Sequence, residues 1–437
     1  MKLLKTDFLK NASVLFSGSL VAQLIGFGSL FIIGRLYSPN DVGELEIILK
    51  ISAVFVAIAG LRYEMAIVVE DDYNDAQELT RLSLFLNGSI SIFLLLLIVI
   101  LKSQLSQWLN LNNSNFLFFI PAISWLAGST EAIIQWRNRE KKYKTISTNR
   151  IATSGAATAY KISHPFLKLF TSNGLILGHT IGLGIGLIHI IYKIPFRIIR
   201  FSKINIARVA KRYRSFPFYS APGAILNIIS TSLPVFLITL YDGQDATGHF
   251  AFAYKLSYLP LSMLAMALGQ VYFERLSRNK NNNSESSELS YELLKIMLAI
   301  VAVPCIILFL WGEELATFLL GNKWSVAGKY IEATILFYTA MFITNPFFNV
   351  FDVYKKLKIE LIFNLLFMAL TGAAMILAYR FHGSTLVALQ WFSVVGVLLR
   401  IGILQYFFKL VGTQKITFLL LILSILGVGY YFIQFNG

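Results

Sequence analysis

The chain has 437 residues, of which 56% are hydrophobic and 14% charged, and its mean hydropathy is +0.65. A chain of this length and hydropathy is excluded from the soluble globular class, because it is too apolar to bury its hydrophobic side chains in a water-exposed domain. The net charge of +15 does not indicate nucleic-acid binding, since the basic segments lack a binding fold and are explained by membrane topology.

Twelve apolar segments of about 20 residues or more follow one another along the chain, and each is long enough to cross a bilayer core of about 30 Å. They lie at 12–35, 42–68, 79–101, 115–137, 147–170, 173–194, 216–240, 246–273, 290–311, 328–351, 358–380 and 384–408. A further apolar segment at 416–435 leaves the count at twelve or thirteen and leaves the side of the C-terminus open. The predicted fold class is therefore an all-α polytopic membrane protein.

Lysine and arginine gather in every second gap between these segments, beginning with the N-terminus. The basic gaps hold Lys2, Lys5 and Lys10, then Arg137 to Lys144, then Lys193 to Arg214, then Arg275 to Lys280, then Lys355 to Lys358. This positive-inside bias predicts a cytoplasmic N-terminus. The basic segment 193–215 is interpreted as a cytoplasmic linker that lies on anionic membrane lipids.

The two halves of the chain carry a weak internal repeat. At, or within one residue of, an offset of 205, the residues Leu36, Tyr37, Asp41, Gly43, Lys50, Ile51 and Ser52 correspond to Leu240, Tyr241, Asp245, Gly248, Lys255, Leu256 and Ser257. The offset spans an even number of segments, so the halves have the same orientation and are related by an axis along the membrane normal. We expect two six-helix bundles around a central cavity, with a lobe at 1–192, the linker at 193–215, a second lobe at 216–410 and an additional C-terminal segment at 411–437.

Charged residues inside apolar segments are candidate sites, because a charge at the bilayer centre costs about 2.5–3.5 kcal/mol on insertion scales. In the fifth segment Arg150, Lys161 and, beyond Pro165, Lys168 fall along one helix face with Ser154, Ala157 and His164. This cationic stripe predicts an anion-binding cavity. The alternative is that Arg150 and Lys168 reach the headgroups at opposite interfaces.

Lys50 and, at the equivalent repeat position, Lys255 are two further deep cations. Together with Lys161 they predict a cavity that favours anions. Glu46 lies four residues before Lys50, so an ion pair within one helix turn is the alternative.

Glu64 and Glu131 are predicted to be buried carboxylates about two turns from a cytoplasmic helix end. Burial and a nearby cation act on such a carboxylate in opposite directions, as a proton-coupling group requires. Structural pairing, of Glu64 with Arg62 or of Glu131 with Arg137, is the alternative. The single cysteine, Cys305, excludes an intrachain disulfide and a cysteine metal cluster. We expect no metal site and no cofactor, apart from H⁺ or Na⁺ as a coupling ion.

Several short motifs, in their order and spacing, resemble the bacterial polysaccharide flippases of the multidrug/oligosaccharidyl-lipid/polysaccharide exporter superfamily. These are the run from Arg35 to Gly43, the run from Leu61 to Glu64, Ala246 to Gly248, and Ala253 to Leu256. The resemblance covers nearly the whole chain. It implies two six-helix lobes around a cationic cavity and the flipping of a polyprenyl-pyrophosphate-linked oligosaccharide, such as an O-antigen unit, across the bacterial inner membrane by alternating access.

By position, the resemblance implies that Lys50, Lys161 and Lys255, joined by Arg150 of the stripe, attract the pyrophosphate, and that Arg62 and Glu64 lie near the inner gate. The implied partners are the lipid-linked substrate, anionic lipids, and the polysaccharide polymerase and chain-length machinery. Two alternatives remain: a multidrug antiporter of the same superfamily, and a membrane polymerase or glycosyltransferase. The deep lysines disfavour the antiporter, and the short extramembrane gaps disfavour an enzyme.

Overall fold

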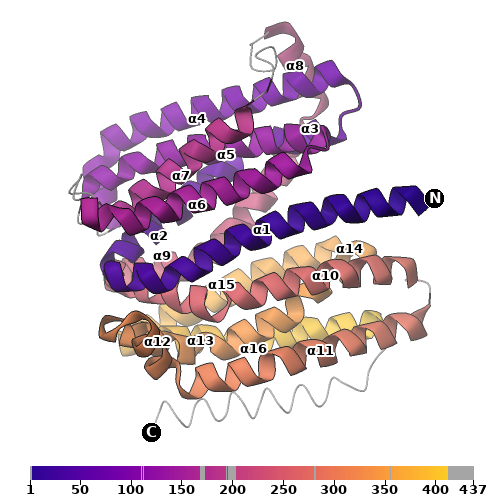
Figure 1. Cartoon of the computed structure of the whole chain (residues 1–437). Helices are drawn as coiled ribbons and strands as arrows, with labels where there is room; N and C mark the ends of the chain where they lie inside the picture. The colour runs from indigo at the N-terminus through magenta and orange to yellow at the C-terminus, as the bar shows by residue number, and fades with distance from the viewer. Residues whose placement is uncertain are drawn as a thin grey trace. The chain divides into compact units, whose positions relative to one another are not determined.

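The computed structural model describes residues 2–109, 111, 113–167, 173–192, 194, 203–279, 282–354 and 356–411. The predicted segment 416–435, Lys168 and most of 193–202 lie outside these residues. The described chain is almost entirely helical and divides into two units (Figure 1). The N-terminal unit comprises Met1–Val235 and Gly243–Gly248, and the C-terminal unit comprises Phe236–Asp242 and His249–Gly437.

The N-terminal unit is built from long helices and short helical turns. They are α1 (Lys2–Leu36), α2 (Pro39–Ala59), α3 (Tyr63–Val69), α4 (Tyr73–Trp108), η1 (Ser114–Phe118), α5 (Phe119–Arg139), α6 (Tyr143–Leu167), α7 (Gly174–Ile191), α8 (Lys203–Arg212), η3 (Phe216–Ser220) and the first part of α9 (Ala221–Ser257). Helix α6 packs between α1 and α7, and α5 contacts α2, α4 and α7.

The C-terminal unit continues α9 and adds helices of similar length. They are α10 (Leu259–Asn279), α11 (Asn283–Leu310), α12 (Gly312–Leu320), η4 (Asn322–Trp324), α13 (Ser325–Thr344), η5 (Asn345–Phe348), α14 (Asn349–Val353), α15 (Leu357–His382) and α16 (Thr385–Leu410). Helix α13 packs against α11, α12 and α16, and α15 packs against α16. Its core is rich in phenylalanine, with Phe347, Phe351 and Phe407 all buried.

Nine stretches of the described helices are long and apolar enough to cross a membrane, compared with the twelve segments predicted up to residue 408. Helices α2, α6 and α10 are not among the nine, because charged and other polar side chains lower their hydropathy. The stretch Phe216–Ser257 covers the predicted segment 216–240 and the first part of 246–273, and α10 carries the rest of the latter. The predicted gap between these two segments coincides with a break inside α9. Gly243 breaks the helix there with φ of 79°, a conformation that glycine adopts without steric cost.

The predicted second segment, 42–68, is two helices rather than one. Ser38 caps α2 through a capping box with Asp41, and Pro39 occupies the first turn. Serine is favoured at the N-cap and proline at the first helical position. The helix ends at Ala59, and Leu61 and Arg62 then adopt positive φ values of 47° and 63° before α3 begins. The charged residues Arg62 and Glu64 are therefore placed at a helix break.

The two repeat glycines contact each other's segments in a reciprocal manner. A Cβ atom on Gly43 would overlap the backbone carbonyl of Gln244, and one on Gly248 would overlap the carbonyl of Pro39. Gln244 and Pro39 are themselves related by the repeat offset of 205. Ser52 and Ser257, another equivalent pair, are 1% and 2% exposed. The repeat read from the sequence thus corresponds to a pseudo-twofold backbone contact inside the N-terminal unit.

Candidate functional site

Three predicted coupling residues come together at the break between α2 and α3. Nη1 of Arg62 lies 3.8 Å from Oε1 of Glu64, and Glu131 of α5 is close enough to act electrostatically on the Glu64 carboxylate. Glu64 is 6% exposed and packs against Gly60, where a Cβ atom would collide with its Oε2. The pairing of Glu64 with Arg62, the alternative to a coupling role, is thus present in the structure.

Within this cluster one carboxylate oxygen remains available. Oε2 of Glu64 is buried and has no hydrogen-bond partner among the described residues. Glu131 accepts a hydrogen bond from Gln135 at 2.6 Å, while Arg137 pairs with Glu140 at 3.2 Å instead of with Glu131. The alternative pairing of Glu131 with Arg137 is therefore wrong. The cluster has two carboxylates and one guanidinium, an arrangement that can hold a proton or a small cation.

Lys50 has the carboxylate partner that its spacing predicts. Its Nζ lies 3.6 Å from Oε1 of Glu46, one helix turn earlier. The Lys50 side chain is 28% exposed, so the pair is only partly removed from solvent. A neighbouring carboxylate reduces the attraction of this lysine for an anion, and pyrophosphate binding by Lys50 stays a prediction.

The cationic stripe of α6 contacts two neighbouring helices, α1 and α7, and its Arg150 is exposed. Arg150 donates to the hydroxyl of Ser19 and Ser154 donates to the carbonyl of Ala22, both on α1. The stem of Lys161 packs against Gly178 of α7, where its Cγ lies within 2.6 Å of a Cβ position. Interhelical packing thus accounts for part of the stripe, and its role in anion binding stays a prediction.

Lys255 lies in the last turn of α9, in the C-terminal unit, and is half-buried. It has the same intermediate exposure as Lys50, its repeat equivalent. Its assignment to the substrate also remains a prediction.

Sequence reasoning missed a buried cation in the C-terminal unit, Arg400 of α16. Its side chain donates from Nη1 to Oγ1 of Thr344 at 3.1 Å and to Oδ1 of Asn345 at 2.9 Å. The guanidinium also lies 5.2–5.7 Å from the ring centroids of three phenylalanines, Phe348, Phe363 and Phe367. The signal was available, since Arg400 is a charge inside an apolar segment.

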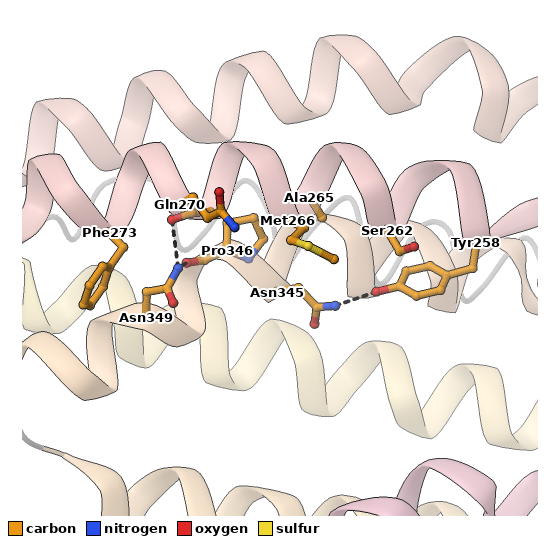
Figure 2. Close-up of a pocket in the computed structure, with 10 residues that line it drawn as sticks. Tyr258, Ser262, Ala265, Met266, Gln270, Phe273, Asn345, Pro346 and Asn349 are labelled. Carbon is orange, nitrogen blue, oxygen red and sulfur yellow. Dashed lines mark hydrogen bonds between the residues drawn. The ribbon is translucent and has the colours of Figure 1, made fainter. Parts of the chain in front are cut away.

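A pocket of about 380 Å³ opens beside this arginine's partner Asn345 (Figure 2). It lies between α10 and the η5–α14 turn, wholly within the C-terminal unit. Its polar lining consists of Tyr258, Ser262, Gln270, Asn345 and Asn349, and its apolar lining includes Met266, Phe273 and Pro346. No predicted site residue lines it.

The basic linker contains an amphipathic helix, α8, that docks on the acidic start of α4. Ile206 and Val209 enter a hydrophobic cluster with Ala76, Leu79 and Trp136. On the polar side, Arg208 pairs with Asp75, and Nη1 of Arg212 lies 3.1 Å from Oε2 of Glu70. Two linker arginines are thus neutralised within the chain, and contact of the linker with anionic lipids stays a prediction.

Hydrogen bonds shift the titration of two groups in this contact. Burial alone would raise the pKa of Glu70, but the Tyr213 hydroxyl at 2.7 Å, the backbone N–H of Asp72 at 3.0 Å and the charge of Arg212 together lower it. Burial and the hydrogen bond to Glu70 raise the pKa of Tyr213 to about 12.

In the described part of the chain, no three His, Cys, Asp or Glu side chains are grouped to hold a metal ion.

A family model described as polysaccharide biosynthesis protein matches residues 32–329. The chain belongs to this family. The match includes Arg62, Glu64 and Glu131 and all of α9 to α12, so it covers most of the N-terminal unit and part of the C-terminal unit.

Two curated relatives are similar to this family member. A Klebsiella pneumoniae protein described as an uncharacterized membrane protein in the cps region is 20% identical over 370 residues, which are 83% of this chain and 74% of the relative. The teichuronic acid biosynthesis protein TuaB of Bacillus subtilis strain 168 is 25% identical over 140 residues, 32% of this chain and 29% of TuaB.

Solved structures show which fold this family member has. Lipid II flippase MurJ, in an inward closed conformation, matches with a TM-score of 0.69 and 13% identity over 97% of this chain and 99% of MurJ. An inward-facing multidrug resistance MATE family transporter of the MOP superfamily matches with a TM-score of 0.67 and 12% identity, over 92% and 99% of the two chains. The predicted all-α polytopic fold is confirmed. The protein is a multi-pass membrane protein of the polysaccharide biosynthesis family.

Proposed function

We propose that this protein flips a polyprenyl-pyrophosphate-linked oligosaccharide, an O-antigen or other surface-polysaccharide repeat unit, from the cytoplasmic to the outer leaflet of the bacterial plasma membrane. The observation that carries the proposal is membership of the polysaccharide biosynthesis family on a fold shared with a lipid-linked precursor flippase. The relatives, a cps-region membrane protein and a teichuronic acid biosynthesis protein, support a surface-glycan substrate.

In this proposal the N-terminus is cytoplasmic and the protein works by alternating access with an ion gradient. Lys50, Arg150, Lys161 and Lys255 attract the pyrophosphate, while Arg62, Glu64 and Glu131 form the gate or ion-coupling group. The buried Oε2 of Glu64, which has no hydrogen-bond partner in the described chain, supports a role for this carboxylate in holding the coupling proton or sodium ion. The polymerase and chain-length proteins are the partners that would receive the flipped unit.

A multidrug antiporter is the second candidate, because the fold also matches a multidrug transporter and Glu64 can attract a cationic drug. The deep lysines favour an anionic substrate instead. The two candidates differ in what their loss would do to the cell.

The test is deletion of the gene in its host, followed by glycan analysis and by localisation of the lipid-linked repeat unit. We expect complete units to accumulate on the cytoplasmic leaflet. Units that reach the outer leaflet unpolymerised would indicate a polymerase defect, and unchanged glycan with new drug sensitivity would indicate an antiporter.

Complementation of the deletion then tests the cations. We expect the triple variant Lys50→Ala, Lys161→Ala, Lys255→Ala to lower surface glycan at least about tenfold while still inserting into the membrane, since each lost charge weakens anion binding. Lys102→Ala is the matched control, because Lys102 lies in the last two turns of α4 and its contacts in the described chain are with Asn115 and the Phe118 ring. Normal glycan in the triple variant would contradict the pyrophosphate assignment.

A further inference from the structure

The pocket of the C-terminal unit presents hydrogen-bonding groups whose orientation the structure fixes. Nδ2 of Asn345 donates to the hydroxyl of Tyr258 at 2.5 Å (Figure 2). Oδ1 of Asn345 accepts from Arg400. Because a guanidinium can only donate, this amide cannot be flipped without losing the bond to Arg400. The Tyr258 oxygen therefore accepts from Asn345, and its own hydrogen is the one that can be donated to a ligand.

Asn349, toward the other end of the pocket, supplies the complementary group. Its Nδ2 donates to the carbonyls of Gly269 at 2.9 Å and Pro346 at 3.0 Å. Both amide hydrogens are thus used, so its Oδ1 is the atom that can accept from a ligand. Gly269 makes the close approach possible, since a Cβ there would lie only 3.3 Å from Nδ2 of Asn349.

The lining chemistry indicates the class of ligand. Among the described residues that line the pocket, none is charged, which disfavours a phosphate or a cationic drug as occupant. A fixed donor and a fixed acceptor stand on either side of an apolar surface formed by Met266 and Pro346. Hydroxyl groups on a ring with apolar faces complement this arrangement, because each hydroxyl both donates and accepts.

The pocket lies in predicted membrane segments, where a side-chain amide needs water or a ligand as a hydrogen-bond partner. Its lining comes from α10 and η5, within the predicted membrane segments 246–273 and 328–351. An amide facing hydrocarbon would be costly, so Gln270, Asn345 and Asn349 favour a face that opens on a hydrated passage. At about 380 Å³ the volume is at the small end of ligand pockets, about 300–1,000 Å³.

We infer that this pocket holds one uncharged sugar ring of the lipid-linked glycan, with Tyr258 and Asn349 bonding to its hydroxyls. Arg400 is a positioning residue that orients the Asn345 amide and, through it, the Tyr258 hydroxyl. The inference rests on the proposed function and adds to it a site that reads the glycan separately from its pyrophosphate.

The test compares two probes on the full-length protein in lipid nanodiscs. One probe is the host's polyprenyl-pyrophosphate-linked repeat unit, and the other is polyprenyl pyrophosphate without sugar. We expect the wild-type protein to bind the glycan-bearing probe at least about tenfold more tightly, as two or so added hydrogen bonds would give.

Variants then locate the source of this ratio. Tyr258→Phe and Asn349→Ala should each bring the ratio toward one and leave the affinity for the bare carrier unchanged. Thr371→Ala is the matched control, since Thr371 is a buried hydroxyl of the same unit bonded to the Phe367 carbonyl, and it should keep the wild-type ratio. Arg400→Leu should lower the ratio, and Arg400→Lys, which retains a donor for Asn345, should restore part of it.

The outcomes separate this inference from the proposed function. A wild-type ratio of one, with tight binding of both probes, would overturn the sugar pocket and leave the flippase proposal standing. A high ratio that survives both Tyr258→Phe and Asn349→Ala would place sugar recognition elsewhere and also overturn it. If neither probe binds, both proposals are overturned together.

Discussion

Three cations of the N-terminal unit and one buried arginine of the C-terminal unit are held in different ways. In the N-terminal unit Lys50, Arg62 and Arg137 each have a carboxylate within 3.2–3.8 Å. In the C-terminal unit Arg400 is held by a threonine, an asparagine and phenylalanine rings. No carboxylate of the described chain forms an ion pair with it. A paired cation is fixed by an opposite charge, whereas Arg400 is free to orient a neutral side chain. The first arrangement suits coupling and the second suits recognition.

The largest expected difference between the units comes from one glycine substitution made in each. Gly248→Ala would drive a Cβ atom into the Pro39 carbonyl, so a backbone shift costing about 3 kcal/mol of unfolding free energy is expected. Gly402→Ala, in α16, meets open space within 4 Å and should stabilise by about 0.5–1 kcal/mol. Unfolding in detergent measures both. A tolerated Gly248→Ala would mean that the reciprocal contact is not tight.

Removal of one buried arginine from each unit should give a smaller difference. Arg137→Leu leaves the carbonyls of Ile190 and Tyr192 and the Glu140 carboxylate without their donor, and should destabilise by about 3 kcal/mol. Arg400→Leu leaves only neutral acceptors and should cost about 1 kcal/mol or less. Equal losses in thermal unfolding would contradict the contrast between paired and unpaired cations.

The smallest effect expected is the pH dependence of the contact between α8 and α4. Because the folded pKa of Glu70 lies below its unfolded value of 4.5, its contribution is complete above that pH and is lost as pH falls through the lowered pKa. Tyr213, with its pKa raised to about 12, contributes fully below pH 10 and loses its contribution as pH rises toward 12.

Hydrogen exchange of the α8 amides measures this dependence. Protection should be constant between about pH 5 and pH 9, after correction for intrinsic exchange, and should fall below pH 4. Glu70→Gln should remove the acidic loss. An α8 that stays protected at pH 3 would show that Ile206 and Val209 hold the helix without the charges.

The sequence predicted the fold class and the repeat because both depend on features spread over many residues. The length of the apolar segments and the spacing of Lys50 and Lys255 do not depend on where each segment boundary is placed to within a few residues. The break at Leu61 and Arg62 was missed, because the local signal for it is Gly60, and a single glycine is also tolerated inside a continuous helix. The Glu46–Lys50 pair was predicted as an alternative from its spacing, and the Arg62–Glu64 pair was predicted as the structural alternative to a coupling role.

The pocket could not have been predicted, because it depends on contacts between residues far apart in the chain. Asn345 meets Tyr258 across 87 positions and Arg400 across 55. Asn345 and Asn349 gave only a polar helix face, and the role of their amide atoms depends on which donors and acceptors tertiary packing brings to them. The docking of α8 on acidic residues was also not predicted, because Arg208 and Arg212 in a basic linker are equally consistent with contact to anionic lipids.

The reciprocal contact of Gly43 and Gly248 has the geometry of an isologous interface, in which each of two equivalent surfaces contacts the other in the same way. Two separate half-length chains related by a twofold axis would make this contact between subunits. The present chain makes it between its own repeats, as a fused dimer does. Since each glycine faces the backbone opposite the other, a side chain gained at either position would close the same space, and neither repeat can change there independently.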